Sequence, residues 1–300
     1  MLTYRKCLFA LRTTLALILG ALWIFLQPPQ SVQAEAWWTS NKVEEARPVE
    51  GGIDYERVLY QKPNGRPVRA HILSVTGVGS DYIFGVLGAF GVLLPPSDFA
   101  QQSGAVVVVN GSYFSKKPTR AQGLVIAHNR VLYPPHAGGT LRGAVGFSPT
   151  SVLFDWIGMD DINGFRLQSD KPGWNDCHSA LGAGPMLIRK GKPRTDAEME
   201  GFNLEQFAPR TAIGHTRDGR ILLLVIDGRQ PDWSEGVTLL ELTEILVNRQ
   251  SIDALNLDGG GSSTLVIQNQ VINRPSDYAL PGQPGRERSV ANVIALFHKQ

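Results

Sequence analysis

Short apolar runs, each closed by a turn-forming residue, are the dominant pattern along the chain. Glycine, proline, aspartate or asparagine bounds each run, which is typical of strands joined by tight turns. The runs predict strands at residues 71–75, 105–109, 123–127, 143–147, 185–189, 221–226, 254–257, 264–268 and 290–297. Several, such as 105–109 (AVVVV), are apolar at every position, as in a central strand that is covered on both faces. The pattern therefore predicts more sheet than helix.

One segment, residues 238–249, has helical periodicity instead. Thr238 and Glu241 have the spacing of a capping box, in which each side chain accepts a hydrogen bond from the backbone amide of the other. Apolar residues then recur at helical spacing, and the pattern fades near Arg249. A helix here would connect the strands 221–226 and 254–257. These two strands should then be parallel, with their carboxyl ends at one edge of the sheet.

Together these elements predict an α+β protein with a mixed β-sheet core and flanking helices. A chain of 300 residues, 43% hydrophobic and 19% charged, is long enough to bury one large core. We expect a single domain over residues 53–300. Residues 35–52 mix charged and polar side chains and should form a linker or an irregular lead-in.

The first 34 residues have the pattern of an export signal. Arg5, Lys6 and Arg12 precede an apolar stretch at 15–26, which is short for a membrane span, and Ala34 ends a motif of small residues that suits cleavage. The alternative is an uncleaved N-terminal anchor, which would be the chain's one contact with a membrane. In both cases the remaining chain should be exported, to a periplasm, a cell envelope or the surrounding medium.

Charge and cysteine content change once this leader is set aside. Three of the 29 basic residues and none of the 27 acidic ones lie in residues 1–34, so the remainder carries a formal charge near −1. Such a balance gives no indication of a nucleic-acid partner. Cys7 lies in the leader, which leaves Cys177 alone and allows no intramolecular disulfide. The dipeptide Cys177-His178 is more typical of packing than of chemistry.

Candidate chemistry lies where predicted strands end. Asp227-Gly-Arg229 follows the strand 221–226, Asp258 follows the strand 254–257, and Asn110-Gly follows the strand 105–109. Asp-Gly and Asn-Gly are common turn dipeptides. A tight turn, however, needs one or two glycines, whereas three follow Asp258 before two serines. Successive glycine amides can form a concave nest for an anion, so we expect a ligand site here.

The remaining motifs narrow the chemistry. The sequence contains no Gly-x-Ser-x-Gly, His-Glu-x-x-His or Ser-x-x-Lys motif and no Walker lysine after the glycines, and its six histidines lack metal-ligand spacing. Carboxylates, an asparagine, glycine amides and arginines are left. This set suits a sugar or a phosphate-bearing substrate.

Seven segments together resemble the phosphodiester glycosidase family. The segments are 110–114 (NGSYF), 182–185 (GAGP), 210–214 (RTAIG), 227–229 (DGR), the capped helix from Thr238, 256–263 (NLDGGGSS) and 286–292 (RERSVAN). The resemblance covers about residues 70–298, and 256–263 is its most specific part. Two positions depart from the family pattern: Ser112, where many relatives have glycine, and Ser289, where proline is common.

The resemblance implies a single catalytic domain that hydrolyses the C1–O bond of a sugar-1-phosphodiester. The products would be free sugar and a phosphomonoester. The expected export and the lack of disulfides suggest that the substrate is a phosphorylated glycan of an envelope or exopolysaccharide. A phosphate monoester leaves as a stable anion, so stabilising its charge can replace much of the proton donation that other glycosidases need. No cofactor is implied. A calcium ion bound at the acidic loop stays open.

The resemblance also suggests roles for individual residues. Asp258 would be the catalytic carboxylate, as nucleophile or as base for water, and Asp227 the second carboxylate or a binder of sugar hydroxyls, with the two roles open to exchange. Arginines and loop amides would bind the phosphate, and Asn110 would bind the sugar. The predicted substrate-binding set is Asn110, Arg210, Arg229, Gly259, Gly260, Gly261, Ser262, Ser263 and Arg288.

Two other functions are compatible with the same residues. An exported binding protein could hold a phosphorylated glycan with the same loop and arginines without turning it over. A phosphodiesterase could break the P–O bond, a reaction that usually needs metal ions.

Overall fold

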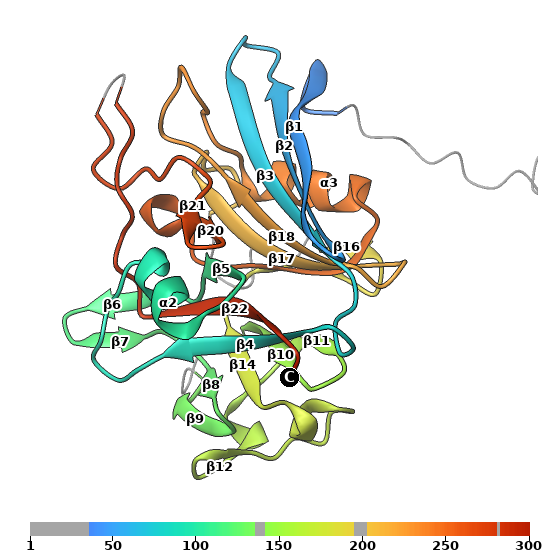
Figure 1. Cartoon of the computed structure of the whole chain (residues 1–300), viewed down its shortest axis with the longest axis vertical. Coiled ribbons are helices and arrows are strands. Elements are labelled where there is room, and N and C mark those ends of the chain that lie inside the picture. Colours follow the sequence, from blue (N-terminus) through green and yellow to red (C-terminus); the bar gives the residue numbers. More distant parts are fainter. Residues whose placement is uncertain (1–35, 136–141, 195–202, 281–282) are drawn as a thin grey trace, which may run out of the picture. The chain divides into compact units, whose positions relative to one another are not determined.

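Strands make up most of the computed structural model, which describes residues 36–135, 142–194, 203–280 and 283–300 (Figure 1). Within these ranges there are 22 strands and two α-helices, α2 (Pro96–Ser103) and α3 (Leu239–Asn248). The predicted α+β core with flanking helices is therefore wrong: the protein is mostly β, with several antiparallel sheets. Residues 37–300 form one compact unit. The predicted leader, 1–34, lies outside the described residues, and no described helix is long and apolar enough to cross a membrane.

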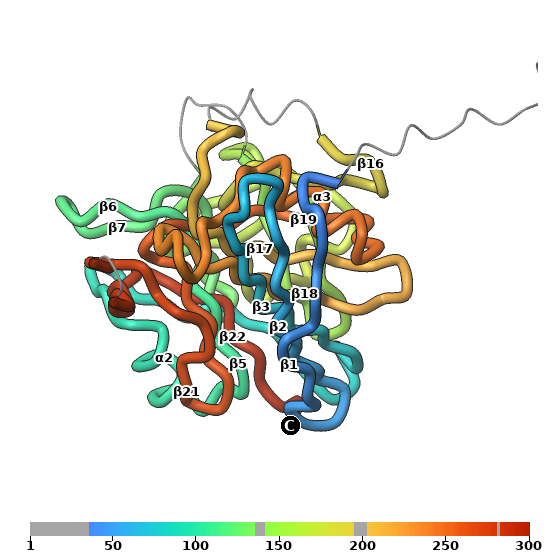
Figure 2. Tube along the Cα trace, turned by 90° about the horizontal axis from the view of Figure 1, so that it is seen from above, coloured from blue at the N-terminus to red at the C-terminus, as the bar shows by residue number. Residues whose placement is uncertain are grey.

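The largest sheet has eight strands, and every neighbouring pair in it is antiparallel. Its first three strands run side by side in Figure 2. In spatial order the strands are β1 (Ser40–Glu50), β2 (Ile53–Gln61), β3 (Pro67–Val75), β18 (Ile221–Ile226), β17 (Arg210–Thr216), β19 (Ser251–Asn256), β15 (Met186–Arg189) and β16 (Lys192–Pro193).

Two five-stranded sheets and two short ribbons complete the strand content. The first five-stranded sheet contains β11 (Val152–Trp156), β10 (Gly143–Phe147), β14 (Ser179–Gly182), β8 (Val125–Ala127) and β9 (Arg130–Tyr133). The second contains β21 (Gln270–Val271), β20 (Leu265–Ile267), β5 (Val107–Asn110), β22 (Asn292–His298) and β4 (Tyr82–Gly88). The ribbons are β6 (Phe114–Lys116) with β7 (Thr119–Ala121), and β12 (Ile162–Asn163) with β13 (Arg166–Leu167). The 3-10 turns of the described residues are η1 (Met159–Asp161), η2 (Trp174–Asp176) and η4 (Gly260–Ser262).

The main core is formed where the sheets face one another. One apolar cluster combines Leu73 of β3, Val109 of β5 and Val145 of β10 with buried residues of many other strands. Strand β5 has the two buried faces that its sequence predicts, because Val108 on the other face packs with Phe99 of α2. Other sheets cover most of the faces that flanking helices were expected to cover. This is why short apolar strands and few helices suffice for the core.

The predicted unit from β18 through α3 to β19 is present. The Thr238 hydroxyl accepts from the Glu241 amide at 3.0 Å, and the Glu241 carboxylate accepts from the Thr238 amide at 2.8 Å, so the capping box is confirmed. Strand β17 lies between β18 and β19 and is antiparallel to both. The strands β18 and β19 are therefore parallel to each other, and their carboxyl ends lie at one edge of the sheet.

Residues 35–52, expected to be a linker, contain the strand β1. This strand is mostly exposed, and its charged side chains show none of the apolar alternation that predicts a strand. Backbone pairing with β2 and ion pairs hold it: Glu44 accepts from Arg57 at 3.0 Å and from Arg69 at 2.9 Å. Charged residues of this kind are common on edge strands, where they discourage pairing with other chains.

Replacing the N-cap residue of α3 tests how much the capping box stabilises this helix. Thr238→Ala removes the acceptor for the Glu241 amide and should lower the free energy of unfolding by about 1 kcal/mol. Thr238→Ser keeps a hydroxyl and should retain most of that stability. Urea unfolding followed by circular dichroism measures both variants. Equal stability of Thr238→Ala and wild type would show that the cap does not stabilise the helix.

Candidate active site at the β19 loop

Backbone hydrogen bonds to neighbouring segments fix the start of the loop after β19. The amide of Leu257 donates to the Thr211 carbonyl at 2.8 Å, and the amide of Asp258 donates to the Gly111 carbonyl at 3.0 Å. Side chains reinforce this anchoring, since the Asn110 amide donates to the Asp258 carbonyl at 2.6 Å. The backbone that carries the Asp258 carboxylate is thus fixed by strands of two different sheets.

The Asp258 carboxylate is partly buried and lies among donors and cations. Its Oδ1 accepts from the Gly259 amide at 2.9 Å, and the Ser262 hydroxyl donates to it. Burial raises the pKa of Asp258 to about 6, although the Ser262 hydrogen bond and the charges of Arg288 and Arg229 act in the opposite direction. A carboxylate with such a pKa is ionised near neutral pH and is still a competent base.

Gly260 and Gly261 each lie against an arginine guanidinium, and Gly259 lies against the Pro209 carbonyl with Arg210 next to it. A Cβ on Gly259 would lie 3.8 Å from Cδ of Arg210, and a Cβ on Gly260 would lie 2.8 Å from a guanidinium nitrogen of Arg229. A Cβ on Gly261 would lie only 2.4 Å from a guanidinium nitrogen of Arg288. The three predicted arginines therefore converge on this loop, and the absence of side chains at Gly260 and Gly261 permits the approach of two of them.

The three arginines differ in how they are held. Arg288 donates to Oδ1 of Asp277 at 2.5 and 3.0 Å and to the Ser262 hydroxyl at 3.4 Å. Arg210 donates to the carbonyls of Val237 and Gln206, and burial lowers its pKa. Arg229 is exposed, and among the described residues no carboxylate pairs with it. Arg229 is thus the cation of the three that is most open to a ligand.

The predicted amide nest is largely occupied by the protein itself. The Gly259 amide donates to Asp258, the Gly260 amide to the Pro209 carbonyl at 2.8 Å, and the Ser262 amide to the Gly259 carbonyl at 3.2 Å. Within the described part of the chain, the Gly261 amide is the one of these four with no such partner. Guanidinium groups rather than amides therefore offer most of the free donors at this loop.

Asp227 lies in a buried hydrogen-bond network, and its side chain has 0% exposure. Its carboxylate accepts from Nε2 of His71 at 3.1 Å, Nε1 of Trp233 at 2.7 Å and Nδ2 of Asn273 at 3.0 Å. The Arg274 amide donates to both of its oxygens. Asn273 links the network to the β19 loop, because it also donates to the Ser263 carbonyl at 3.1 Å. Both oxygens of Asp227 are therefore bound by protein donors, and its role as second carboxylate or binder of sugar hydroxyls stays a prediction.

Asn110 is fully buried and also bonded to protein partners. Besides its bond to Asp258, its Oδ1 accepts from the Thr211 hydroxyl at 2.8 Å and from the Thr264 amide at 3.1 Å. Ser263 is buried as well, and its hydroxyl has no partner among the described residues. Sugar binding by Asn110 or Ser263 stays a prediction, and the structure shows each of them inside the loop's support.

Tyr113 and Asp277 belong to the site although no role was predicted for them. The Tyr113 hydroxyl contacts the carbonyls of Gly184 at 2.9 Å and Leu257 at 3.3 Å, and burial and the neighbouring Asp258 charge raise its pKa. Arg142 lies 5.8 Å from the centre of its ring. Tyr113 is part of the segment 110–114 that resembles the family, so that motif was its available signal. Asp277 lies in a loop with no sequence pattern to mark it.

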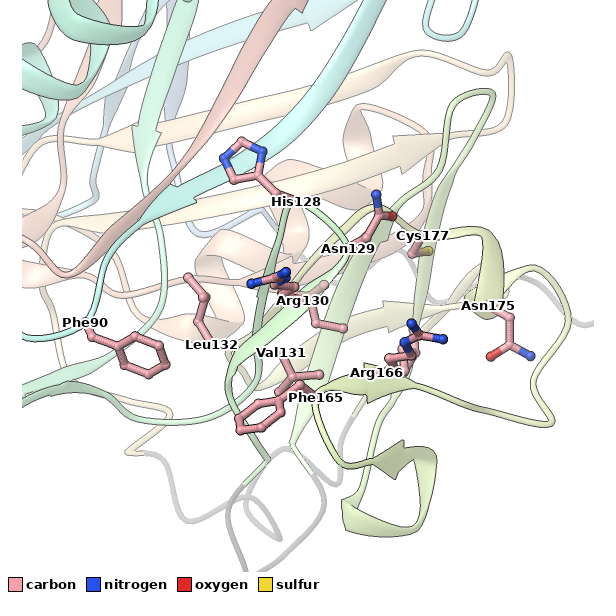
Figure 3. Close-up of a pocket in the computed structure, with 12 residues that line it drawn as sticks. Phe90, His128, Asn129, Arg130, Val131, Leu132, Phe165, Arg166, Asn175 and Cys177 are labelled. Carbon is pink, nitrogen blue, oxygen red and sulfur yellow. The ribbon is translucent and has the colours of Figure 1, made fainter.

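A large pocket lies away from the β19 loop. It measures about 830 Å³, and its lining comes mainly from β8, β9 and β13 (Figure 3). Phe90 and Phe165 border it with Arg130 and Arg166, and none of the predicted site residues lines it. Burial raises the pKa of Cys177, which also borders it, to about 12, as expected for a packing cysteine. A pocket of about 500 Å³ includes Arg229 and so adjoins the β19 loop.

Metal-ligand clusters can be assessed only where side chains are described. In residues 36–135, 142–194, 203–280 and 283–300, no three His, Cys, Asp or Glu side chains gather closely enough to hold a metal ion.

Comparisons of sequence point to one family. The model of the phosphodiester glycosidase family matches residues 103–297. The human N-acetylglucosamine-1-phosphodiester alpha-N-acetylglucosaminidase is 37% identical over 203 residues, which cover 63% of this chain and 37% of that protein. The protein of the same name from Bos taurus is 28% identical over 210 residues, covering 66% and 38%. The chain thus spans well under half the length of these relatives.

Comparisons of structure give the same fold. The catalytic domain of the zebrafish N-acetylglucosamine-1-phosphodiester alpha-N-acetylglucosaminidase, auto-inhibited by its pro-peptide, aligns with a TM-score of 0.66 and 21% identity, over 87% of this chain and 89% of that one. A hypothetical protein from Synechocystis aligns with a TM-score of 0.67 and 17% identity, over 87% and 64%.

The close approach of Arg288 to Gly261 can be tested through stability. In Gly261→Ala the new methyl would overlap Arg288 and Asp277, so the pair must shift, and we expect a loss of about 1–3 kcal/mol in the free energy of unfolding. Gly51→Ala is the matched control, because nothing lies within 4 Å of its Cβ. Urea unfolding measures both.

A second background separates crowding of the arginine from backbone strain. If the methyl acts through the guanidinium, Gly261→Ala should cost less in an Arg288→Ala protein than in wild type. Equal costs in the two backgrounds would refute the contact.

Proposed function

Because the chain belongs to the phosphodiester glycosidase family, we propose that it hydrolyses the C1–O bond of a sugar-1-phosphodiester. Free sugar and a phosphomonoester are the products. The observation that carries the proposal is the convergence of three arginines on the loop that presents Asp258. A reacting carboxylate beside a cluster of guanidinium groups suits a substrate whose leaving group is an anion.

Charge stabilisation of the leaving group explains the composition of the site. Rupture of the C1–O bond leaves negative charge on the phosphate and develops positive charge at the sugar carbon. Arg229 is exposed and has no carboxylate partner in the described chain, so it can bind phosphate oxygens directly. Arg288, held by Asp277, and Arg210 add positive charge at fixed positions. A protonated acid is therefore less necessary than in a glycosidase with an alkoxide leaving group.

Asp258 is the proposed reacting carboxylate, as nucleophile on the sugar carbon or as base for the attacking water. Its partial burial and its raised pKa fit either role. Asp227 is proposed as a positioning residue, because its oxygens are already bound by His71, Trp233 and Asn273. The network fixes the end of β18 and, through Asn273, the β19 loop.

The substrate is proposed to be a phosphorylated glycan outside the cytoplasm. The family match supports a sugar-1-phosphodiester, and the pattern of residues 1–34 supports export to an envelope or an exopolysaccharide. A non-catalytic binder of the same glycan, or a phosphodiesterase that breaks the P–O bond, would use the same arginines, and the assay below separates them.

Replacing Asp258 tests the reaction. Asp258→Asn keeps the shape of the side chain but removes its charge and its nucleophilic oxygen, and kcat toward an aryl diester of N-acetylglucosamine 1-phosphate should fall at least 100-fold. Asp218→Asn, in an exposed turn, is the control and should retain turnover. Circular dichroism checks that both variants are folded.

The products decide between the three functions. Hydrolysis in labelled water should place the isotope in the released sugar. Isotope in phosphate together with loss of activity on chelation would establish the phosphodiesterase, and tight binding with no product would establish the binder. Undiminished turnover of Asp258→Asn would remove Asp258 from the chemistry.

The raised pKa of Asp258 predicts the acid limb of the pH–rate profile. Protonation removes the reacting lone pair, so kcat/KM should decrease as pH falls through about 6. Ser262→Ala removes a hydrogen bond that lowers this pKa, so the limb should move to higher pH. Ser263→Ala should leave the limb in place, since that hydroxyl has no partner in the described structure. A limb unmoved by Ser262→Ala would assign it to another group.

A further inference from the structure

The pocket of about 500 Å³ beside the β19 loop is lined by arginines from three separate segments. Arg66 comes from the turn between β2 and β3, Arg229 from the loop after β18, and Arg274 from the loop after β21. Arg229 belongs to both places, because it borders the pocket and its guanidinium also lies against Gly260. The pocket therefore shares Arg229 with the candidate active site.

The positive charges of this pocket are only partly balanced by the protein, since the charge of Arg229 acts on Asp258. In the described chain, Arg66, Arg229 and Arg274 form no ion pair, whereas Arg69 nearby binds Glu44 and Arg288 binds Asp277. Asp232 is the acidic residue among those that line the pocket, and it is exposed. Three guanidinium groups against one exposed carboxylate favour an anionic ligand.

Two polar atoms of the lining residues are buried and have no hydrogen-bond partner within the described part of the chain. They are Nε of Arg274 and Oε1 of Gln230, a residue with 7% exposure. Buried polar groups are nearly always hydrogen-bonded, so these two atoms are available to a ligand. Nε of Arg274 is a donor and suits a phosphate oxygen, whereas Oε1 of Gln230 is an acceptor and suits a hydroxyl of the attached sugar. The Gln230 side chain is itself fixed, because its Nε2 donates to the Arg274 carbonyl at 3.0 Å.

The wall of the pocket is rigid, and the buried Asp227 network holds it. Asp227 binds the Trp233 indole and the Arg274 amide. The Trp233 ring lies 3.9 Å from the Arg69 guanidinium carbon and 5.4 Å from that of Arg274. Trp233 therefore supports arginines and has little free face for stacking on a sugar. The pocket is built for charge rather than for a neutral glycan.

Resting on the proposed function, we infer that this pocket binds a second phosphate of the same substrate. One phosphate lies at the β19 loop, next to the bond that breaks, and the next lies between Arg66 and Arg274, with Arg229 between the two positions. A substrate with an uncharged leaving portion would use only the first. The geometry thus points to a chain of sugars joined by repeated phosphodiesters as the substrate class.

The test compares a substrate with one phosphodiester and a synthetic fragment with two consecutive sugar-1-phosphodiester units. Wild type should prefer the two-phosphate fragment by about tenfold in kcat/KM, and Arg66→Gln and Arg274→Gln should each reduce that ratio toward one, chiefly through KM. Arg217→Gln, at an exposed position in the turn after β17, is the matched control and should keep the wild-type ratio. Arg66 is exposed in a turn, so its variant should fold even if Arg274→Gln does not.

A binding measurement makes this result independent of turnover. By calorimetry, 1,3-propanediol bisphosphate should bind wild type about tenfold more tightly than propyl phosphate, and Arg66→Gln should abolish the difference. Cleavage of the short substrate with a ratio of one and no preference for the bisphosphate would overturn the inference and leave the proposed function standing. An arginine-dependent preference for the bisphosphate without cleavage of either substrate would support the two-phosphate pocket and overturn the proposed function.

Discussion

The structure around the site depends on bringing several guanidinium groups against one short stretch of backbone. Like charges repel, and the charge of Arg229 contributes to lowering the pKa of Arg210. The protein offsets this repulsion with Asp258 and Asp277 and reduces the distances with glycines, which have no Cβ to keep the cations apart. The glycines therefore allow the arginines to approach the loop, and the arginines in turn can bind an anion.

This cluster is possible because the large sheet delivers its parts to one edge. The strands β18 and β19 end in parallel, and β17 begins with Arg210 between them. A second sheet contributes Asn110, which fixes the Asp258 carbonyl. A rigid backbone under a charged loop reduces the reorganisation that accompanies charge development in a reaction. The same edge places Asp227 where it can hold both the loop and the wall of the adjoining pocket.

The elements that the sequence predicts correctly are those whose signals lie within a few neighbouring residues. All nine apolar runs form strands close to their predicted ranges, and the capping box starts α3, because these signals lie within a few residues of one another. Strand β1 was missed because partners on β2 and β3 stabilise it rather than its own side-chain pattern. The prediction of flanking helices was wrong because the sheets cover one another, and this packing depends on contacts between strands that are distant in the sequence.

The sequence likewise predicts which residues belong to the site better than it predicts their hydrogen-bond partners. The association of Asp258 with arginines could be expected from the motifs that resemble the family, whereas the partner of each hydrogen bond could not. The Gly260 amide donates to the distant Pro209 carbonyl, and the Asp227 oxygens accept from the distant His71 and from Trp233, which only the folded loop brings back to Asp227. An amide nest and a second catalytic carboxylate are reasonable readings of the sequence, but long-range partners occupy most of those groups.

Ser262 connects the two charges that the reaction would use. Its hydroxyl donates to the Asp258 carboxylate and accepts from Arg288 at 3.4 Å. A single hydroxyl can do both at once, since it has one donor and two lone pairs. Each bond polarises the other, so the positive charge of Arg288 strengthens the hydrogen bond that stabilises ionised Asp258. If an anion bound the arginines, as in the proposed reaction, part of that support would be withdrawn, and the Asp258 carboxylate would become more basic when it has to act as base or nucleophile.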